Sequence, residues 1–337
     1  MPHSLIAPLN IIGGGSAQMD VVTVFGASGF IGRYVVGEIA KSGSRVRAAV
    51  RRPDRASFLK PMGDVGQVTP VAANIRDDAS VAAAVEGADI VINLVGILFP
   101  GKKQTFESLQ VDGAQRVAQA AKAAGAKRLV QVSAIGADAQ SGSAYASSKG
   151  IGEQIVREAF PGATVVRPSI VFGPEDDFLN RFATLAIFSP ALPLIGGGHT
   201  KLQPVYVGDV ADAITSICQD PKTAGATYEL GGPQVRSFRE LMEIVLKEID
   251  RKRLLVPLPF PIATAQASIL ELIFLLPQML NLGANPPVTV DQIKLLRHDN
   301  VVTGDLPGLE ELGIDATALE TIVPAYLRRY RRGVWHT

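Results

Sequence analysis

From residue 20 onward, short runs of apolar residues alternate with longer stretches in which apolar residues recur at helical spacing. The short runs are continuous and rich in β-branched residues, which is typical of strands buried on both faces of a parallel sheet. We expect strands at 21–25, 45–50, 90–95 and 128–132, and helices at 30–41, 79–85 and 106–124. This alternation predicts an α/β protein of Rossmann type, with a doubly wound parallel sheet and helices on both faces.

The alternation becomes less regular after about residue 175. We expect short strands at 205–207 and 227–230, helices at 209–219 and 238–249, and a proline-spaced stretch at 254–261. These elements predict a smaller C-terminal α/β lobe that packs over the carboxyl ends of the sheet and is interleaved with the Rossmann core. The expected division is a flexible lead-in at 1–19, a Rossmann domain at 20–175 and the smaller lobe at 176–337.

Composition excludes several classes of protein. Of the 337 residues, 47% are hydrophobic and 19% are charged, and the formal net charge is +1. A chain this apolar is not disordered as a whole. A nearly neutral chain also lacks the basic face that nucleic acid binding needs, so we expect no nucleic-acid partner. Cys218 is the sole cysteine and the four histidines are scattered, so we expect neither a disulfide nor a metal site.

The first expected strand leads directly into the run GASGFIG, in which Gly26, Gly29 and Gly32 follow a GxxGxxG spacing. In such a loop the first glycine makes a tight turn, the second lets the backbone approach a pyrophosphate, and the third lets the helix pack on the strand. The free N–H groups and the dipole of the helix then attract the anion. Strand, loop, helix and strand occur in the required order, which predicts a dinucleotide site. The expected contacts are Gly26, Ser28, Gly29, Phe30, Ile31 and Gly32.

The end of the second expected strand indicates which dinucleotide binds. An NAD-binding chain usually has an acidic residue there to hold the ribose 2′-hydroxyl. This chain has Arg51 and Arg52 instead, and guanidinium groups suit a 2′-phosphate. We therefore expect NADP(H), with a solvated basic turn as the alternative. Other expected contacts lie at successive strand ends, where ligands bind in such sheets. They are Asn74 and Ile75 near the adenine, and Leu94, Val95 and Gly96 near the ribose.

Tyr145 and Lys149 lie four residues apart, on one face of an expected helix, and Ser133 ends the preceding strand. A nearby ammonium group is expected to lower the pKa of the tyrosine, and the same lysine would hold a ribose hydroxyl. Ser133 would donate to the substrate oxygen, which completes a proton relay for hydride transfer to a carbonyl. The alternative is that Tyr145 and Lys149 only hold the cofactor.

The glycine loop, Ser133, the Tyr145/Lys149 pair and the run RPSIVFG at 167–173 resemble the short-chain dehydrogenase/reductase superfamily, in its atypical and extended branches. This resemblance implies that Pro168 and Ile170 lie beside the nicotinamide. A narrower resemblance covers nearly the whole chain from about residue 20. It rests on GASGFIGRYVV, INLVGIL, the EDDFLNRF run at 175–182 and the DNVV run at 299–302.

That narrower resemblance is to the nucleotide-binding accessory subunit of respiratory complex I, subunit nine of its alpha subcomplex, together with bacterial relatives. It implies a tightly bound, structural NADPH near the junction of the peripheral arm with the membrane, and other complex I subunits as partners. A stabilising role without independent turnover follows. The rival hypothesis is a free-standing NADPH-dependent reductase acting on a small or lipid-like carbonyl, because Ser133, Tyr145 and Lys149 are all present.

Two features bear on location. The lead-in lacks the pattern of a secretory signal and contains no arginine, so we expect the cytoplasmic side of a bacterial inner membrane, or the matrix side in an organelle. The apolar segment 269–282 is too short to cross a bilayer, since crossing takes about 20 apolar residues. It is expected to be either a core helix or an interfacial segment with Glu271, Gln278 and Asn281 toward water and its leucines in the headgroup region, ended or kinked at Pro277. The arginine-rich run 328–332 is expected either to be attracted to an anionic leaflet or to form a solvated helix end.

Overall fold

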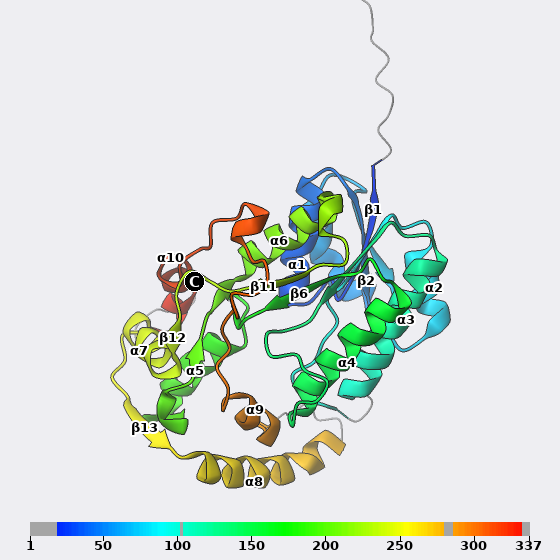
Figure 1. Ribbon diagram of the computed structural model, residues 1–337. Helices are drawn as coiled ribbons and strands as arrows, with labels where there is room; N and C mark the ends of the chain where they lie inside the picture. Colours follow the sequence, from blue (N-terminus) through cyan, green and yellow to red (C-terminus); the bar gives the residue numbers. More distant parts are fainter. Residues whose placement is uncertain (1–18, 102–103, 280–285, 332–337) are drawn as a thin grey trace, which may run out of the picture.

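The structure is a computed structural model that describes residues 19–101, 104–279 and 286–331. A seven-stranded sheet with the order β11-β6-β5-β4-β1-β2-β3 forms its centre (Figure 1). All neighbouring strands in it run parallel, and the order is that of a Rossmann fold. The strands are β1 (Val21–Phe25), β2 (Arg45–Val50), β3 (Val68–Ala72), β4 (Ile90–Asn93), β5 (Arg128–Val132), β6 (Thr164–Pro168) and β11 (Thr227–Leu230). The predicted doubly wound parallel sheet is confirmed.

Helices cover both faces of this sheet. On one face α1 (Phe30–Lys41) packs against α6 (Val207–Gln219). On the other lie α2 (Asp78–Val85), α3 (Asp112–Ala123) and α4 (Ala144–Ala159). Each face has its own apolar core, because alternate side chains of a buried strand point to opposite faces. Val22 and Val24 belong to the first core, and Phe25 and Val91 to the second.

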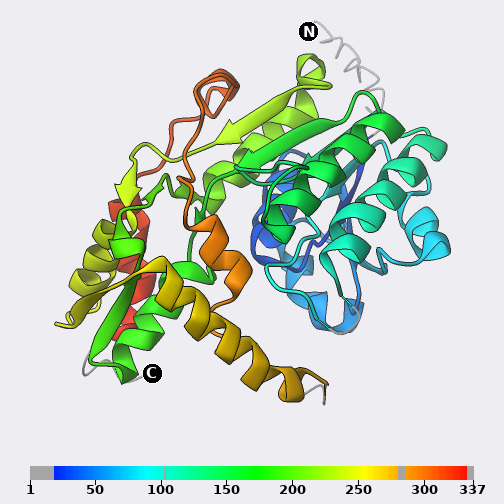
Figure 2. The same ribbon diagram turned by 60° about the horizontal axis from the view of Figure 1, so that its bottom comes forward.

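The remaining elements form a second lobe beside the carboxyl ends of the strands (Figure 2). Its longer elements are α5 (Phe178–Phe188), β8 (Ala191–Ile195), α7 (Phe238–Glu248), β13 (Leu254–Leu258), α8 (Phe260–Met279), α9 (Val290–Leu295) and α10 (Leu319–Leu327). Short strand pairs join β7 (Val171–Phe172) to β10 (Val205–Tyr206) and β9 (Lys201–Leu202) to β12 (Arg236–Ser237). Phe172, Leu179 and Phe238 lie in the core of this lobe.

Several element boundaries differ from the sequence prediction. Val207 begins α6 instead of ending a strand, and the helix expected at 106–124 starts with a π-helical turn, Glu107–Val111. Residues 227–230 form the edge strand β11 of the main sheet, so α6 and β11, from the second half of the chain, complete the Rossmann unit. β3 and β6 were not predicted as separate strands.

Helix α8 differs most from its prediction. It continues through Pro277 to Met279 instead of stopping before it. Ile269, Leu272 and Ile273 are 58%, 71% and 59% exposed, so the core-helix interpretation is wrong for the described side chains. Glu271 accepts a hydrogen bond from the backbone N–H of Val290 at 2.8 Å and is not simply turned to water. No helix in the described part of the chain combines the length and the apolar character needed to cross a membrane.

Parts of three predictions lie outside the described residues. They are residues 1–18 of the lead-in, residues 280–282 of the apolar segment and Arg332 of the arginine-rich run.

Candidate functional site

The glycine loop connects β1 to α1 at the carboxyl edge of the sheet. Gly26 has φ +78°, and a Cβ there would lie 3.3 Å from the backbone of Leu94 and Val95. At Gly32 a Cβ would lie 2.2 Å from the carbonyl oxygen of Gly26, so no side chain fits. Gly29 precedes α1, whose first turn carries no acidic residue. The uncompensated helix N-terminus therefore presents positive potential beside a loop without side chains at Gly26, Gly29 and Gly32, which suits a phosphate.

The side chains around this loop divide between the surface and the core. Ser28 is exposed beside Gly29. The ring of Phe30 meets Tyr34 edge-on at 6.3 Å. A Cβ on Gly173 would lie 3.3 Å from that Phe30 ring, so the ring contacts the segment after β7. Ile31 is partly buried and packs against the core between the sheet and α1.

A recess of about 250 Å³ lies at the ends of β2 and β3. Its walls consist of Arg51, Ala72, Ala73, Asn74, Arg76 and Ser80. Arg51 thus lies where the sequence predicts an adenosine phosphate, whereas Arg52 is exposed before a 3₁₀ segment and does not line the recess. The side chain of Ile75 is buried in the core and does not line this recess.

Sequence reasoning missed Arg76 and Ser80 in this recess. The Asn74 N–H donates to Ser80 Oγ at 2.9 Å, and the Arg76 N–H donates to Asn74 Oδ1 at 3.2 Å. These bonds fold the chain after β3 into a turn that leads to α2. The position of Arg76 two residues after Asn74, near a strand end, was the signal that could have found it, whereas Ser80 lies in α2 and carried no such signal.

The end of β4 lies next to Lys149. A Cβ on Gly96 would be 3.1 Å from Lys149 Nζ, so the backbone here and the ammonium group are adjacent. Leu94 packs toward the core beside α1, and Val95 toward the core on the opposite face. The Val95 N–H donates to Asn93 Oδ1 at 3.1 Å, which fixes the turn after β4.

Ser133, Tyr145 and Lys149 lie close together. Lys149 Nζ donates to the carbonyl oxygen of Val132 at 3.3 Å and lies 5.9 Å from the centre of the Tyr145 ring. Phe106 meets the same ring edge-on at 6.0 Å. Ser133 Oγ is the one buried side-chain nitrogen or oxygen in the described residues that has no hydrogen-bond partner. An orphaned hydroxyl costs free energy unless a ligand satisfies it, so the position fits a bound polar group.

The electrostatics of this group differ from the sequence prediction. Burial raises the pKa of the Tyr145 hydroxyl to about 12, so the expected lowering is wrong. Lys149 does not offset this effect, since its own burial lowers the pKa of its ammonium group to about 8. Glu153 raises the pKa of Lys149 but is outweighed. Both groups therefore favour their neutral forms more than they would in water.

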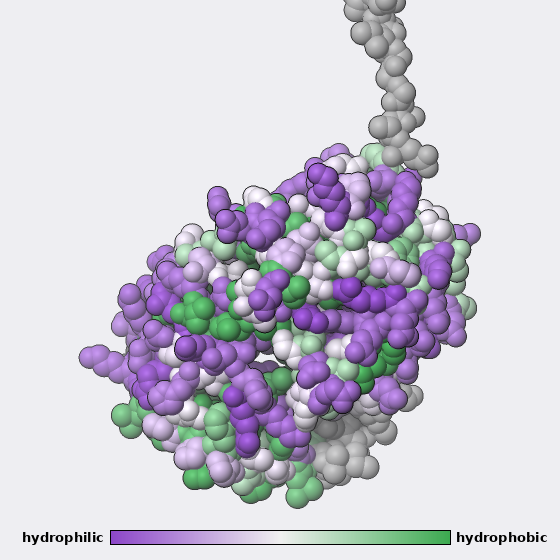
Figure 3. All heavy atoms as spheres, in the orientation of Figure 1, coloured by the Kyte–Doolittle hydropathy of each residue, from purple (hydrophilic) through white to green (hydrophobic). Residues whose placement is uncertain are grey.

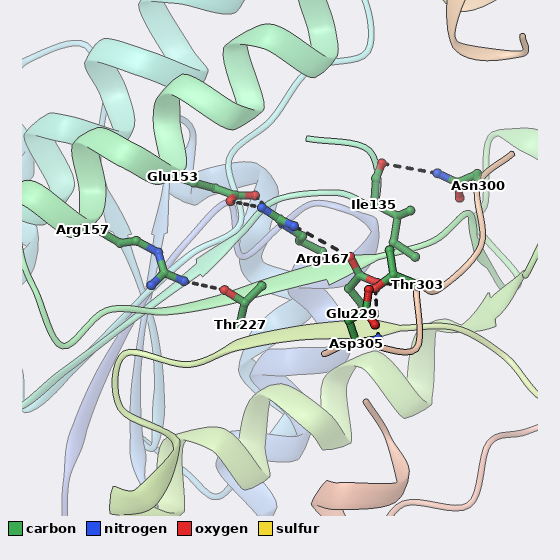
Figure 4. A network of polar contacts seen from close by, with 9 residues as sticks. All are labelled: Ile135, Glu153, Arg157, Arg167, Thr227, Glu229, Asn300, Thr303 and Asp305. Atoms are coloured by element: carbon green, nitrogen blue, oxygen red, sulfur yellow. Dashed lines mark hydrogen bonds and ion pairs between the residues drawn. The ribbon is translucent and has the colours of Figure 1, made fainter. Parts of the chain in front are cut away.

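Pro168 and Ile170 lie at the boundary between the sheet and the smaller lobe. The Pro168 carbonyl accepts from the Ile135 N–H at 3.0 Å, and the Ile170 N–H donates to Asn300 Oδ1 at 3.1 Å. Asn300 Nδ2 donates in turn to the carbonyl of Ile135 at 3.4 Å (Figure 4). The DNVV run of the sequence thus supplies a residue that fixes this boundary, which the sequence alone did not show.

The arrangement suits one kind of ligand. The recess at the ends of β2 and β3, the glycine loop after β1 and the orphaned Ser133 hydroxyl after β5 follow one another along the carboxyl edge of the sheet. This order matches the adenosine, pyrophosphate and nicotinamide parts of a dinucleotide. Within the described residues no cluster of three or more His, Cys, Asp or Glu side chains is placed to hold a metal ion.

Fold and site together define an NAD(P)-binding Rossmann protein of the short-chain dehydrogenase/reductase type, and the NAD(P)H-binding family matches residues 26–184. The chain is 40% identical to NADH dehydrogenase (ubiquinone) 1 alpha subcomplex subunit 9 of Arabidopsis thaliana, over 95% of this chain and 81% of that protein. It is 37% identical to the Mus musculus protein of the same name, over 99% of this chain and 86% of that protein. The chain belongs to this subunit 9 family of complex I, as its sequence resemblance implies.

More distant proteins show the range of this fold. A ceramide reductase of Caulobacter vibrioides is 32% identical over 73% of this chain and 76% of its own. Among solved structures, a triphenylmethane reductase from Citrobacter has a TM-score of 0.71 at 21% identity, over 91% of this chain and 99% of its own. A dTDP-glucose 4,6-dehydratase from Streptomyces venezuelae, solved with NAD, has a TM-score of 0.69 at 20% identity, over 94% of this chain and 99% of its own. At these identities the solved structures support the fold alone.

Proposed function

We propose that this chain is an NADP(H)-binding accessory subunit of respiratory complex I that stabilises the junction of the peripheral arm with the membrane. The observation that carries this proposal is the similarity to the subunit 9 proteins, which extends over 95% to 99% of the chain and so includes the smaller lobe. A protein that shared the nucleotide-binding domain alone would match over about half of this length. The partners of the chain would then be other complex I subunits.

Two features favour NADP(H) over NAD(H). Arg51 lines the recess at the ends of β2 and β3, and no carboxylate ends β2 to hold a ribose 2′-hydroxyl. A guanidinium group forms strong, charge-assisted bonds with phosphate. In this proposal the glycine loop holds the pyrophosphate, Arg51 and Asn74 face the adenosine end, and Lys149 holds the nicotinamide ribose.

The bound nucleotide would contribute stability. It would lie between the Rossmann sheet and the smaller lobe, along the edge where Asn300 joins the two parts. A ligand that binds the folded state alone adds its binding free energy to that state. We therefore infer that NADPH is a built-in component, and that turnover is not needed for this role.

Helix α8 provides a surface for the membrane side of the junction. Figure 3 shows apolar residues gathered along the lower edge of the molecule, where α8 lies. In α8 itself, Ile262, Ile269, Leu272 and Ile273 are each more than half exposed. An apolar helical face of this kind suits the headgroup region of a bilayer or an apolar partner beside it. We propose peripheral binding at the cytoplasmic side of the bacterial inner membrane.

Native purification from detergent-solubilised membranes tests the role in complex I. We expect the chain to co-migrate with NADH:ubiquinone oxidoreductase activity, and its NADPH to remain bound after long dilution. A free protein with readily exchanging nucleotide would contradict the proposal. Flotation with liposomes tests the membrane surface separately: Leu272→Ser with Ile273→Ser should reduce flotation. The exposed pair Val65→Ser with Val235→Ser serves as the matched control, and equal flotation of all variants would exclude lipid contact.

A second candidate function is reduction of a lipid-like carbonyl by NADPH. The observation that favours it is the group formed by Ser133, Tyr145 and Lys149, in which the Ser133 hydroxyl has no partner in the described protein. The relative named ceramide reductase is consistent with such a substrate. In this reaction NADPH would pass a hydride to the carbonyl carbon, and the Tyr145 hydroxyl would pass a proton to its oxygen.

A further inference from the structure

Helix α9 of the smaller lobe contacts the beginning of α4, the helix that carries Tyr145 and Lys149. Asp291 makes three hydrogen bonds there. Its Oδ2 accepts from Ser143 Oγ at 2.9 Å and from the Tyr145 N–H at 3.1 Å, and its Oδ1 accepts from the Ala144 N–H at 2.8 Å. A carboxylate from a different lobe thus supplies acceptors that α4 lacks by itself.

This contact matters because the first N–H groups of a helix have no partner within the helix. The side chain of Ser143, the residue that precedes α4, accepts from the Ala146 N–H at a long 3.3 Å, and its carbonyl accepts from the Ser147 N–H at 2.9 Å. Asp291 accepts from the N–H groups of Ala144 and Tyr145, the two residues between Ser143 and Ala146. Its negative charge also faces the positive end of the helix dipole, which strengthens the contact. Lys294, one turn further along α9, donates to the carbonyl of Gly142 at 3.1 Å and holds the preceding loop.

The position of Tyr145 therefore depends on α9. Tyr145 lies in the first turn of α4 and donates its own N–H to Asp291, so a shift of this turn moves the ring. The recess that contains Arg51 is built from the ends of β2 and β3 and makes none of these contacts. Loss of the Asp291 carboxylate should thus disturb one end of the site and leave the other end intact.

We propose that Asp291 is a positioning residue for the nicotinamide end of the dinucleotide site, acting through the first turn of α4. Glu271 extends this connection, because its carboxylate accepts from the N–H of Val290 and joins α8 to α9. The apolar face of α8 is in this way linked to Tyr145. The proposal goes beyond the role in complex I, since it requires dinucleotide binding alone and holds whether or not the nucleotide is turned over.

The test compares a whole dinucleotide with a fragment that lacks the nicotinamide half. Affinities of the full-length chain for NADPH and for adenosine 2′,5′-bisphosphate are measured by calorimetry, after bound nucleotide has been removed. Asp291→Ala should weaken NADPH about tenfold, as expected for loss of a strong helix cap, and leave the fragment within about twofold. Asp291→Asn keeps one acceptor and should give an intermediate loss. NADH with ADP serves as the equivalent pair if NADH is preferred.

Asp220→Ala is the matched control, because Asp220 also caps a helical turn through its carboxylate but does so at the opposite edge of the sheet. It should leave both affinities unchanged. Glu271→Gln should weaken NADPH less than Asp291→Ala, in the same direction. An equal loss of NADPH and of the fragment would show a general effect on folding and overturn the proposal. Unchanged NADPH affinity in Asp291→Ala would overturn it as well.

Discussion

Arg167 and Glu153 form a two-pronged ion pair between β6 and α4. Arg167 Nε lies 2.9 Å from Glu153 Oε1, and Nη2 lies 2.7 Å from Oε2 (Figure 4). Arg167 Nη1 is also 3.7 Å from Oε1 of Glu229 on β11. Oε2 of Glu229 accepts from the N–H and the hydroxyl of Thr303 at 2.8 and 2.9 Å. One guanidinium group therefore compensates two carboxylates that are 6% and 4% exposed.

The first prediction concerns this network. Arg167→Met should lower the free energy of unfolding by about 3–5 kcal/mol, because it leaves two buried carboxylates without a cation. Urea unfolding followed by circular dichroism measures the change. Arg33→Met is the control: its ion pair with Glu175 is 29% and 39% exposed, so about 1 kcal/mol or less is expected. A similar loss of unfolding free energy in the two variants would show that the buried network stabilises the fold no more than the exposed ion pair does.

The second prediction concerns cofactor choice. Arg51→Ala should weaken NADPH roughly 10- to 100-fold, as loss of a bond between charged groups allows, while NADH binding changes little. Arg52→Ala should have a much smaller effect, since Arg52 does not line the recess. Calorimetric titration of each variant with NADPH and with NADH measures these affinities. If NADPH and NADH weaken equally in Arg51→Ala, then Arg51 does not contact a 2′-phosphate.

The third prediction separates the two candidate functions. Tyr145→Phe removes one hydroxyl and keeps the ring that packs against Phe106. If the chain reduces a carbonyl, this change should abolish NADPH oxidation and leave NADPH affinity within about twofold, since the hydroxyl moves the proton. If the chain is a structural subunit, complex I assembly and nucleotide retention should be unchanged. Turnover that survives in Tyr145→Phe would remove Tyr145 from the reaction.

Local patterns explain what the sequence could predict. Five of the seven strands of the Rossmann sheet (β1, β2, β4, β5 and β11) and the glycine loop were predicted, because β-branched runs and glycine spacing are properties of neighbouring residues. The contact of Asp291 with Tyr145 joins residues 146 apart in the chain, and no local pattern identifies such a partner. The same holds for Asn300 and Ile170, 130 residues apart.

Burial was the other quantity that sequence patterns left open. The apolar run at 269–274 has the composition of a core helix, but its partners in the lobe cover the small side chains Ala263 and Ala267 and leave Leu272 exposed. The pKa of Tyr145 was misjudged for a related reason. Spacing places a lysine beside the tyrosine, but it does not reveal that both groups are buried, and burial dominates.

The last prediction follows from the buried Lys149. Its pKa falls from 10.5 to about 8 on folding, since burial disfavours the ammonium form. Below pH 8 Lys149 is protonated in both the folded and the unfolded state, so the folded state carries the full free-energy cost of a buried ammonium group. Between pH 8 and about 10.5 the unfolded state binds more protons, so the free energy of unfolding gains a contribution that rises with pH.

Lys149→Met should therefore stabilise the nucleotide-free protein at pH 7, by roughly 1–3 kcal/mol, and weaken NADPH binding. The advantage of the variant should shrink as the pH rises from 8 to 10, which urea unfolding at pH 7, 8, 9 and 10 measures. Lys122→Met replaces an exposed lysine and should stay within about 0.5 kcal/mol of the unmodified protein throughout. A constant difference between Lys149→Met and the unmodified protein over this range would mean that Lys149 is not a buried cation in the folded state.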